Sequence, residues 1–232
     1  MNIYETTKNF YNQYIYKLVI YNPLSHSFRT ELQREGTLSH VRKQLDKYQL
    51  DYENGIPLQR EVWRTNISIS KEDFFDAKDI YSRLKSHHKQ YIVRIGLGND
   101  IIIYSNNKEF LVDLGNSVRT EAVSFYEPPK KLKELLKKEK DIAFVSKKPK
   151  FVLRVTLGRK PGSNELASWL KNNTDKSKIG KTAMSYLEDQ EYVNGLYFYV
   201  RDEKVLNLIT LLIGDNIRRV QKLVWIEELD KY

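Results

Sequence analysis

The feature that most constrains the fold is an order of elements that occurs twice along the 232-residue chain. Residues 100–118 and residues 196–217 each read as a strand, a polar turn, a leucine-bearing helix that a glycine ends, and a further strand. Residues 90–98 also resemble residues 150–158, but that match pairs a second strand with a first strand. Because single strand patterns recur by chance, we align the halves on the three-element match, which predicts two copies of one domain.

The surrounding segments complete a β-α-β-β-α-β order in each half. In the first half the predicted strands are 62–70, 90–97, 100–104 and 118–126, and the predicted helices are 70–86 and 108–114. In the second half the predicted strands are 151–157, 195–200 and 217–226, the predicted helices are 163–171 and 203–213, and 178–187 is an ambiguous strand that runs into a turn. A strand at 14–21 and a helix at 36–52 precede both halves.

This order is that of a ferredoxin-like domain, in which helices cover one face of a sheet. We therefore predict an α+β protein with two tandem ferredoxin-like (βαββαβ) domains, at 61–128 and 151–232. Residues 1–60 are predicted to be an N-terminal strand and helix extension packed on the first domain. Residues 129–150 are predicted to be a basic connector, with leucines at the spacing of a short amphipathic helix.

The formal charge of +9 is concentrated in one part of the chain. Residues 1–128 hold 17 basic and 16 acidic residues, whereas residues 130–181 hold 16 basic and 5 acidic residues, a net +11. Residues 182–232 carry a net −3. Such asymmetry indicates a polyanionic partner, although a basic surface also serves solubility alone.

Composition excludes several other classes of protein. Cysteine is absent, which excludes disulfides, thiolate metal sites and cysteine nucleophiles. The first residues show no secretory signal, and the longest apolar run, 206–213, is too short to span a bilayer. We therefore expect a soluble cytoplasmic protein with no membrane partner. The wealth of Lys, Ile, Asn and Tyr is typical of AT-rich genomes, those of viruses among them.

Alternation along the strands predicts aromatic residues on the sheet face that the helices leave open. In the second half these residues are Tyr197 and Tyr199, with Arg154 on the neighbouring strand. Tyrosines beside an arginine can stack with unpaired bases, or they can pack across strands or against the other domain. In the first half Ile102 and Tyr104 take this face, where they need a cover.

Basic residues in the connector and in two loops extend the predicted face. The loop 158–163 leads from a strand to a helix, so its backbone amides, Arg159 and Lys160 suit a phosphate. Residues 179–182 end like a nucleotide-binding loop, but Asp175 stands where that motif needs glycine, so we expect no NTPase. The predicted nucleic-acid-binding residues are Lys147, Lys148, Lys150, Arg154, Arg159, Lys160, Lys178, Lys181, Tyr197, Tyr199 and Arg218.

No catalytic residue, metal ligand or cofactor site is predicted. His87 and His88 fall at the C-terminus of a helix, where an imidazolium is stabilised by the helix dipole. Asp73, Asp76 and Asp79 lie near the start of that helix, where acidic side chains are also stabilising. No carboxylate pattern of a metal-dependent nuclease accompanies them.

The leading hypothesis is a non-catalytic protein that binds single-stranded RNA or DNA. A single strand is favoured over a duplex because the chain offers a sheet face and basic loops rather than a helix that enters a groove. The alternative is a structural or assembly subunit, for example of a virus particle, that uses its sheet faces for contacts with a protein partner or in a homo-oligomer. An enzyme ranks third.

Overall fold

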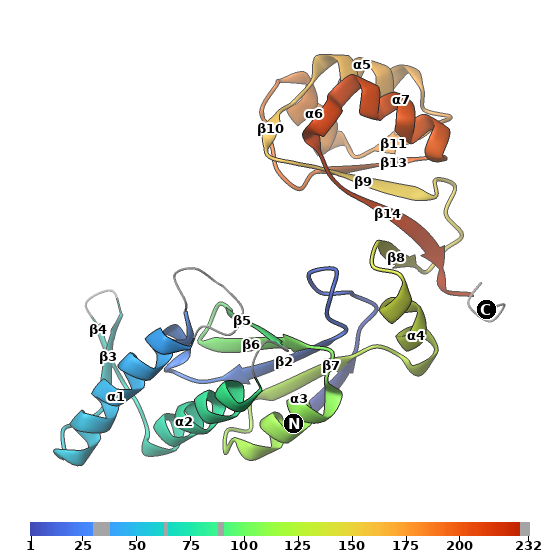
Figure 1. The fold of residues 1–232 in the computed structure, drawn as a ribbon. Coiled ribbons are helices and arrows are strands. Elements are labelled where there is room, and N and C mark those ends of the chain that lie inside the picture. The colour runs from blue at the N-terminus through green and yellow to red at the C-terminus, as the bar shows by residue number, and fades with distance from the viewer. Residues whose placement is uncertain (30–37, 63–64, 88–90, 228–232) are drawn as a thin grey trace. The chain divides into compact units, whose positions relative to one another are not determined.

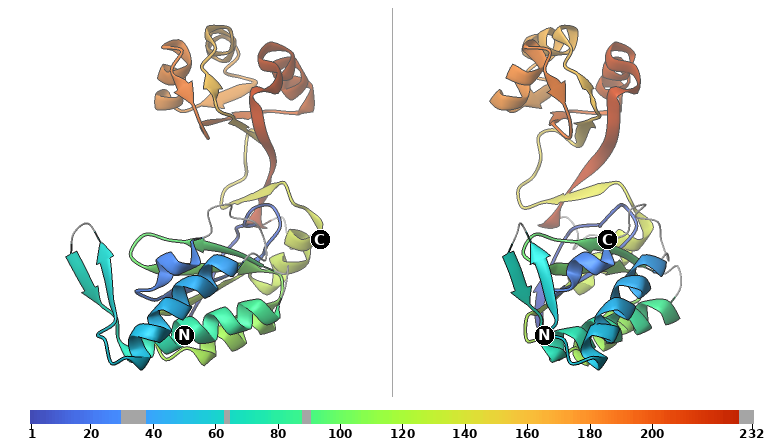
Figure 2. Two further views of the ribbon diagram at one scale, coloured as in Figure 1. Left: turned by 60° about the vertical axis from the view of Figure 1, so that its left-hand side comes forward. Right: turned by 90° about the vertical axis from the view of Figure 1, so that its left-hand side faces the viewer.

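The computed structural model describes residues 1–29, 38–62, 65–87 and 91–227. The chain divides into two compact units, Met1–Lys133 (unit 1) and Glu134–Tyr232 (unit 2). Each unit is an α+β structure built on a five-stranded sheet. The views in Figures 1 and 2 show that, apart from the helix at the boundary between the units, the helices of each unit gather on one face of its sheet. None of the helices built by the described residues has both the length and the apolar composition needed to cross a bilayer.

In unit 1 the sheet has the strand order β1-β7-β2-β6-β5. Strand β1 is parallel to β7, and the other neighbours are antiparallel. The elements are β1 (Asn2–Glu5), β2 (Tyr16–Tyr21), the 3-10 helix η1 (Ser25–Phe28), α1 (Ser39–Glu53), β3 (Gln59–Val62), β4 (Thr65–Ser68), α2 (Lys71–Ser86), β5 (Tyr91–Ile95), β6 (Asp100–Ser105), α3 (Lys108–Ser117) and β7 (Val123–Glu127). Helix α4 (Lys130–Lys138) follows and leads into unit 2.

In unit 2 the sheet has the strand order β8-β14-β9-β13-β11, and again only the first of these pairs is parallel. The elements are β8 (Ile142–Val145), β9 (Leu153–Leu157), β10 (Lys160–Pro161), α5 (Asn164–Asn172), β11 (Ser177–Ile179), α6 (Lys181–Glu188), β12 (Tyr192–Val193), β13 (Tyr197–Val200), α7 (Glu203–Ile213), the 3-10 helix η2 (Gly214–Asn216) and β14 (Ile217–Trp225). Strands β10 and β12 pair in a separate ribbon.

The two sheets correspond strand by strand, which agrees with the three-element match between the halves. The N-caps fix the alignment, because Asn107 accepts a hydrogen bond from the Phe110 amide before α3 and Asp202 accepts one from the Val205 amide before α7. Counting back from these caps, Tyr104 on β6 corresponds to Tyr199 on β13.

The strand predicted at 62–70 is present in part as β4, but its predicted place in the main sheet is wrong, since β4 pairs with β3 in a separate two-stranded sheet. Its expected place is taken by β2, which lies in the sheet between β7 and β6 and so is no extension. Tyr16, Leu18 and Ile20 of β2 are buried on one face, whereas β4 is almost wholly exposed. Alternation alone could not separate these cases, because a solvated hairpin also alternates.

Two further expectations need correction. Residues 142–145 belong to the sheet as β8, not to a connector. Gly115 lies inside α3 rather than after it, and a Cβ at this position would lie 3.1 Å from Cδ1 of Leu18. The glycine therefore permits close contact between α3 and the sheet instead of ending the helix.

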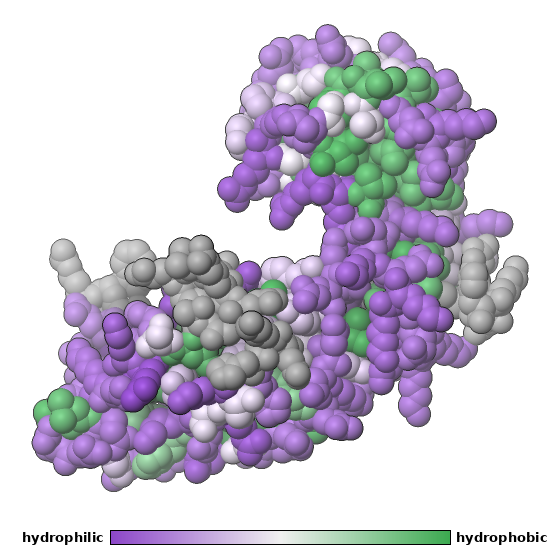
Figure 3. Space-filling view, in the orientation of Figure 1, coloured by the Kyte–Doolittle hydropathy of each residue, from purple (hydrophilic) through white to green (hydrophobic). Residues whose placement is uncertain are grey.

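Helix α7 buries only part of its apolar stripe. Val205 and Ile209 are buried in the unit 2 core, but Leu208 and Leu212, which lie at the same helical spacing, are 52% and 39% exposed. Leu211 is 83% exposed. Figure 3 shows apolar side chains gathered over this helix.

Candidate functional site

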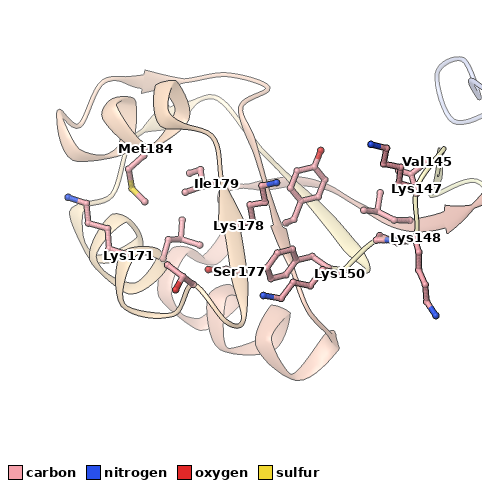
Figure 4. Close-up of a pocket in the computed structure, with 15 residues that line it drawn as sticks. Val145, Lys147, Lys148, Lys150, Lys171, Ser177, Lys178, Ile179 and Met184 are labelled. Carbon is pink, nitrogen blue, oxygen red and sulfur yellow. The ribbon is translucent and has the colours of Figure 1, made fainter.

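Unit 2 contains a groove of about 800 Å³ beside its edge strand β11. Its polar rim is formed by five lysines, and its floor includes apolar side chains of the core (Figure 4). The lysines are Lys147, Lys148, Lys150, Lys171 and Lys178. The apolar floor comprises Val145, Phe151, Leu170, Ile179, Met184 and Leu223, and Tyr199 also lines the groove.

Two local features of the sequence place the lysines. The segment 146–152 joins β8 to β9 and contributes three of them. Lys178 is the middle residue of β11, where Ser177 is buried and Lys178 is exposed, so alternation turns the lysine to the open face. In Figure 4 the Lys171 ammonium points away from the other side chains that line the groove.

The positive charges around the groove are largely uncompensated. Lys171 pairs with Glu188, but within the described part of the chain no carboxylate lies within ion-pair distance of Lys147, Lys148 or Lys178. Lys150 lies over the Phe151 ring, at 5.3 Å from its centroid. A concave surface lined by one sign of charge attracts anions.

A row of side chains crosses the open face from this groove. The strand register places Lys178 beside Tyr199, Tyr199 beside Arg154 and Arg154 beside Gln221. Nε of Arg154 donates to Oε1 of Gln221 over 3.1 Å, and its guanidinium lies 5.5 Å from the centroid of the Tyr197 ring. Arg154 is thus held in place among the aromatic residues.

The two tyrosines lie on the open face as alternation predicts. Tyr197 is 46% exposed and Tyr199 is half-buried, and their rings meet edge to face with centroids 5.6 Å apart. Phe198, between them in sequence, is fully buried against the helices. Burial, reinforced by Tyr197, raises the pKa of Tyr199 above its ordinary value.

The structure brings together only part of the predicted set. Lys147, Lys148, Lys150, Lys178 and Tyr199 line one groove, and Arg154 and Tyr197 lie on the adjoining sheet face. The groove also contains Lys171, which sequence reasoning missed; its place in the last turn of a helix near β11 was the available signal.

The other predicted cations lie elsewhere. Lys160 pairs with Asp215, and its neighbour Arg159 does not line the groove. Lys181 begins α6, at an exposed position. The loop 158–163 therefore lies apart from the lysine groove.

Arg218 is not the residue of β14 that joins the open face. The register shifts between Ile217 and Arg219, so Arg219 lies opposite Thr156 of the open face. Nε of Arg219 lies 3.2 Å from Oδ1 of Asp141. Strict alternation missed this change because the bulge inserts one residue.

The corresponding face of unit 1 carries a similar pair that is covered. Tyr104 corresponds to Tyr199, and Lys17 faces Tyr104 in the register as Arg154 faces Tyr199. The rings of Phe10 and Tyr11 lie 5.2 and 5.0 Å from that of Tyr104. Burial is the main cause that raises the pKa of Tyr104 to about 12. The cover expected for this face thus comes from the segment between β1 and β2.

The cations of this unit 1 face also have partners. The Lys17 ammonium lies 3.5 Å from the centroid of the Tyr126 ring. The Arg94 guanidinium lies over the Tyr11 ring and donates to its hydroxyl over 3.1 Å. The cationic side chains of this face therefore contact aromatic side chains of the same face.

The titratable groups considered for catalysis make structural contacts. Asp76 is buried and accepts hydrogen bonds from the backbone amides of Arg119 and Thr120. The His87 ring stacks on Phe110, and His88 lies outside the described residues. In the described ranges no three His, Asp or Glu side chains gather as metal ligands.

Comparisons with known proteins assign no relative to the chain. No protein-family model matches it, and no curated protein or solved structure is significantly similar to it. A function must therefore be argued from the geometry and charge of the site alone.

Proposed function

We propose that this chain is a non-catalytic protein that binds single-stranded nucleic acid, RNA or DNA, through unit 2. The main support is the lysine groove, whose rim holds cations without carboxylate partners and which adjoins two accessible tyrosines. Lysine ammonium groups bind phosphates, and tyrosine rings stack with unpaired bases. One surface thus offers a partner for both parts of a nucleotide chain.

A ferredoxin-like fold for each unit belongs to the same proposal. Counting β2, β5, β6 and β7 as strands one to four, the sheet order is four-one-three-two, and β9, β11, β13 and β14 give the same order in unit 2. Such a fold leaves one sheet face free of helices. That face and the groove are accessible to a flexible strand, whereas the site presents no helix suited to enter a duplex groove.

The test is a binding titration of a labelled single-stranded oligonucleotide at several salt concentrations. We expect log affinity to fall linearly with log salt, with a slope of about −0.7 for each phosphate neutralised. The double variant Tyr197→Ala with Tyr199→Ala should bind more weakly while keeping its melting temperature within a few degrees. Affinity that does not change between low and physiological salt would contradict the proposal.

A second candidate function, an assembly subunit, is favoured by helix α7. Aligned on the N-caps, the exposed Leu208 and Leu211 correspond to Asp113 and Asn116 of α3. The fold therefore does not require leucine at these positions, and exposed apolar patches often mark protein interfaces. Light scattering distinguishes the two candidates, because a discrete oligomer that ignores oligonucleotides supports assembly.

A further inference from the structure

The two units place different side chains over the same position on their sheets. In unit 1 the segment between β1 and β2 lays Phe10 and Tyr11 against Tyr104. In unit 2 the corresponding segment, 146–152 between β8 and β9, contains no aromatic residue except Phe151, which is buried. Tyr199 thus lacks the aromatic cover that Tyr104 has.

The unit 2 segment brings cations in place of that cover. Lys147, Lys148 and Lys150 line the groove that Tyr199 also lines, and Lys178 is beside Tyr199 in the register. An occupant that completes this surface needs a flat aromatic group for the tyrosine and negative charge for the lysines. A nucleotide unit combines the two, since it joins a base to phosphates.

From this comparison we infer that the groove holds one nucleotide of the bound strand, with its base against Tyr199 and its phosphates at Lys150 and Lys178. The inference rests on the proposed function and extends it, because it assigns base-dependent binding to one tyrosine. In unit 1 the rings of Phe10 and Tyr11 occupy the place that the base takes in unit 2. Tyr104 is therefore no second base-binding site in the intact chain.

Two oligomers of equal length and charge test this assignment. One is a labelled oligothymidylate and the other is the same sugar–phosphate chain without bases. We expect the full-length protein to bind the abasic chain roughly tenfold more weakly, the effect of a single lost stacking contact. Tyr199→Leu should weaken oligothymidylate binding to that level and leave the affinity for the abasic chain unchanged.

Control variants separate this contact from general charge and folding effects. Lys150→Gln with Lys178→Gln should weaken binding of both oligomers by the same factor. Tyr192→Ala removes a 62% exposed tyrosine that does not line the groove, and it should change neither affinity. Melting curves establish that each variant is folded.

The outcomes separate the assignment of the base to Tyr199 from the proposed function. Equal binding of both oligomers by the unmodified protein would overturn the assignment of the base to Tyr199 while leaving the proposed function in place. A difference between the oligomers that survives Tyr199→Leu would also overturn it. Failure to bind either oligomer at low salt would remove the proposed function and this inference together.

Discussion

The open sheet faces of the two units share one arrangement of strands, but the face of unit 1 is covered and the face of unit 2 is not. Each presents a tyrosine beside a basic residue of the neighbouring strand: Tyr104 on β6 beside Lys17 on β2, and Tyr199 on β13 beside Arg154 on β9. In unit 1 the chain covers the tyrosine with its own rings, and in unit 2 it lines the adjoining groove with lysines. The difference lies in one connection between two strands, so the connection, and not the sheet, decides which face is available to a ligand.

The largest expected effect comes from neutralising the groove. Replacing Lys147, Lys148, Lys150 and Lys178 together by glutamine should weaken single-strand binding roughly a hundredfold at low salt and reduce the salt slope by about 3. Fluorescence anisotropy across a salt series measures both quantities.

A matched variant in unit 1 separates local from overall charge. Lys8, Lys43, Lys47 and Lys85 are exposed in unit 1, and their replacement by glutamine removes the same total charge. This control should change affinity by less than about threefold. Equal losses in both variants would show that binding depends on net charge alone and would end the distinction between the units.

A smaller effect is expected when the cover of unit 1 is removed. Phe10→Ser with Tyr11→Ser exposes Tyr104 and deletes two ring contacts, so the free energy of unfolding of unit 1 should fall by about 2 kcal/mol. Denaturant titration measures the loss. Tyr21→Ser, at a position 40% exposed, serves as control and should cost less than about 0.5 kcal/mol. An undiminished stability in the double variant would mean that the two rings do not hold this face closed.

The smallest expected effect concerns the helices that correspond in the two units. Leu211→Asn gives α7 the residue that α3 has at Asn116, and it should change the free energy of unfolding by no more than about 0.5 kcal/mol. Ile209→Asn, which buries an amide in the core, should cost about 3 kcal/mol. A large loss for Leu211→Asn would show that this side chain packs within unit 2, and the second candidate function would lose its support.

Local signals in the sequence were sufficient to locate most helices and strands but not to show which strands pair with one another. Ser70, Asn107, Ser163 and Asp202 all accept hydrogen bonds as N-caps, so the four helices that follow them could be located. Helix α6, whose N-cap Gly180 has no side chain to accept such a bond, lies in the segment that was predicted as a strand and a turn. Strand pairing depends on distant segments, which is why β2 and β8 were assigned to an extension and a connector. The apolar pattern of β2 was visible, but nothing local shows which strands neighbour it.

The site was predictable to the extent that alternation and charge determine it. Tyr197 and Tyr199 follow from the period of two along β13, whereas Lys178 was expected in a basic turn and instead lies within the strand β11. The floor of the groove and Lys171 come from separate elements that meet only in the folded unit, and Arg218 was misplaced by one bulge. Tertiary convergence and register shifts leave no simple mark in a single sequence.

The parallel strand at the edge of each sheet has a consequence for how the chain folds. Strand β8 pairs with β14, from Ile142 opposite Lys222 to Val145 opposite Trp225, about 80 residues further along the chain, and β1 pairs with β7 over a longer interval still. Closing such long loops is entropically costly, and high contact order slows folding. During synthesis each sheet must wait for its last strand before its first strand has a partner. The segment 146–152 is anchored at one end by this pair, so the lysine groove is complete only once β14 has been made and has paired with β8.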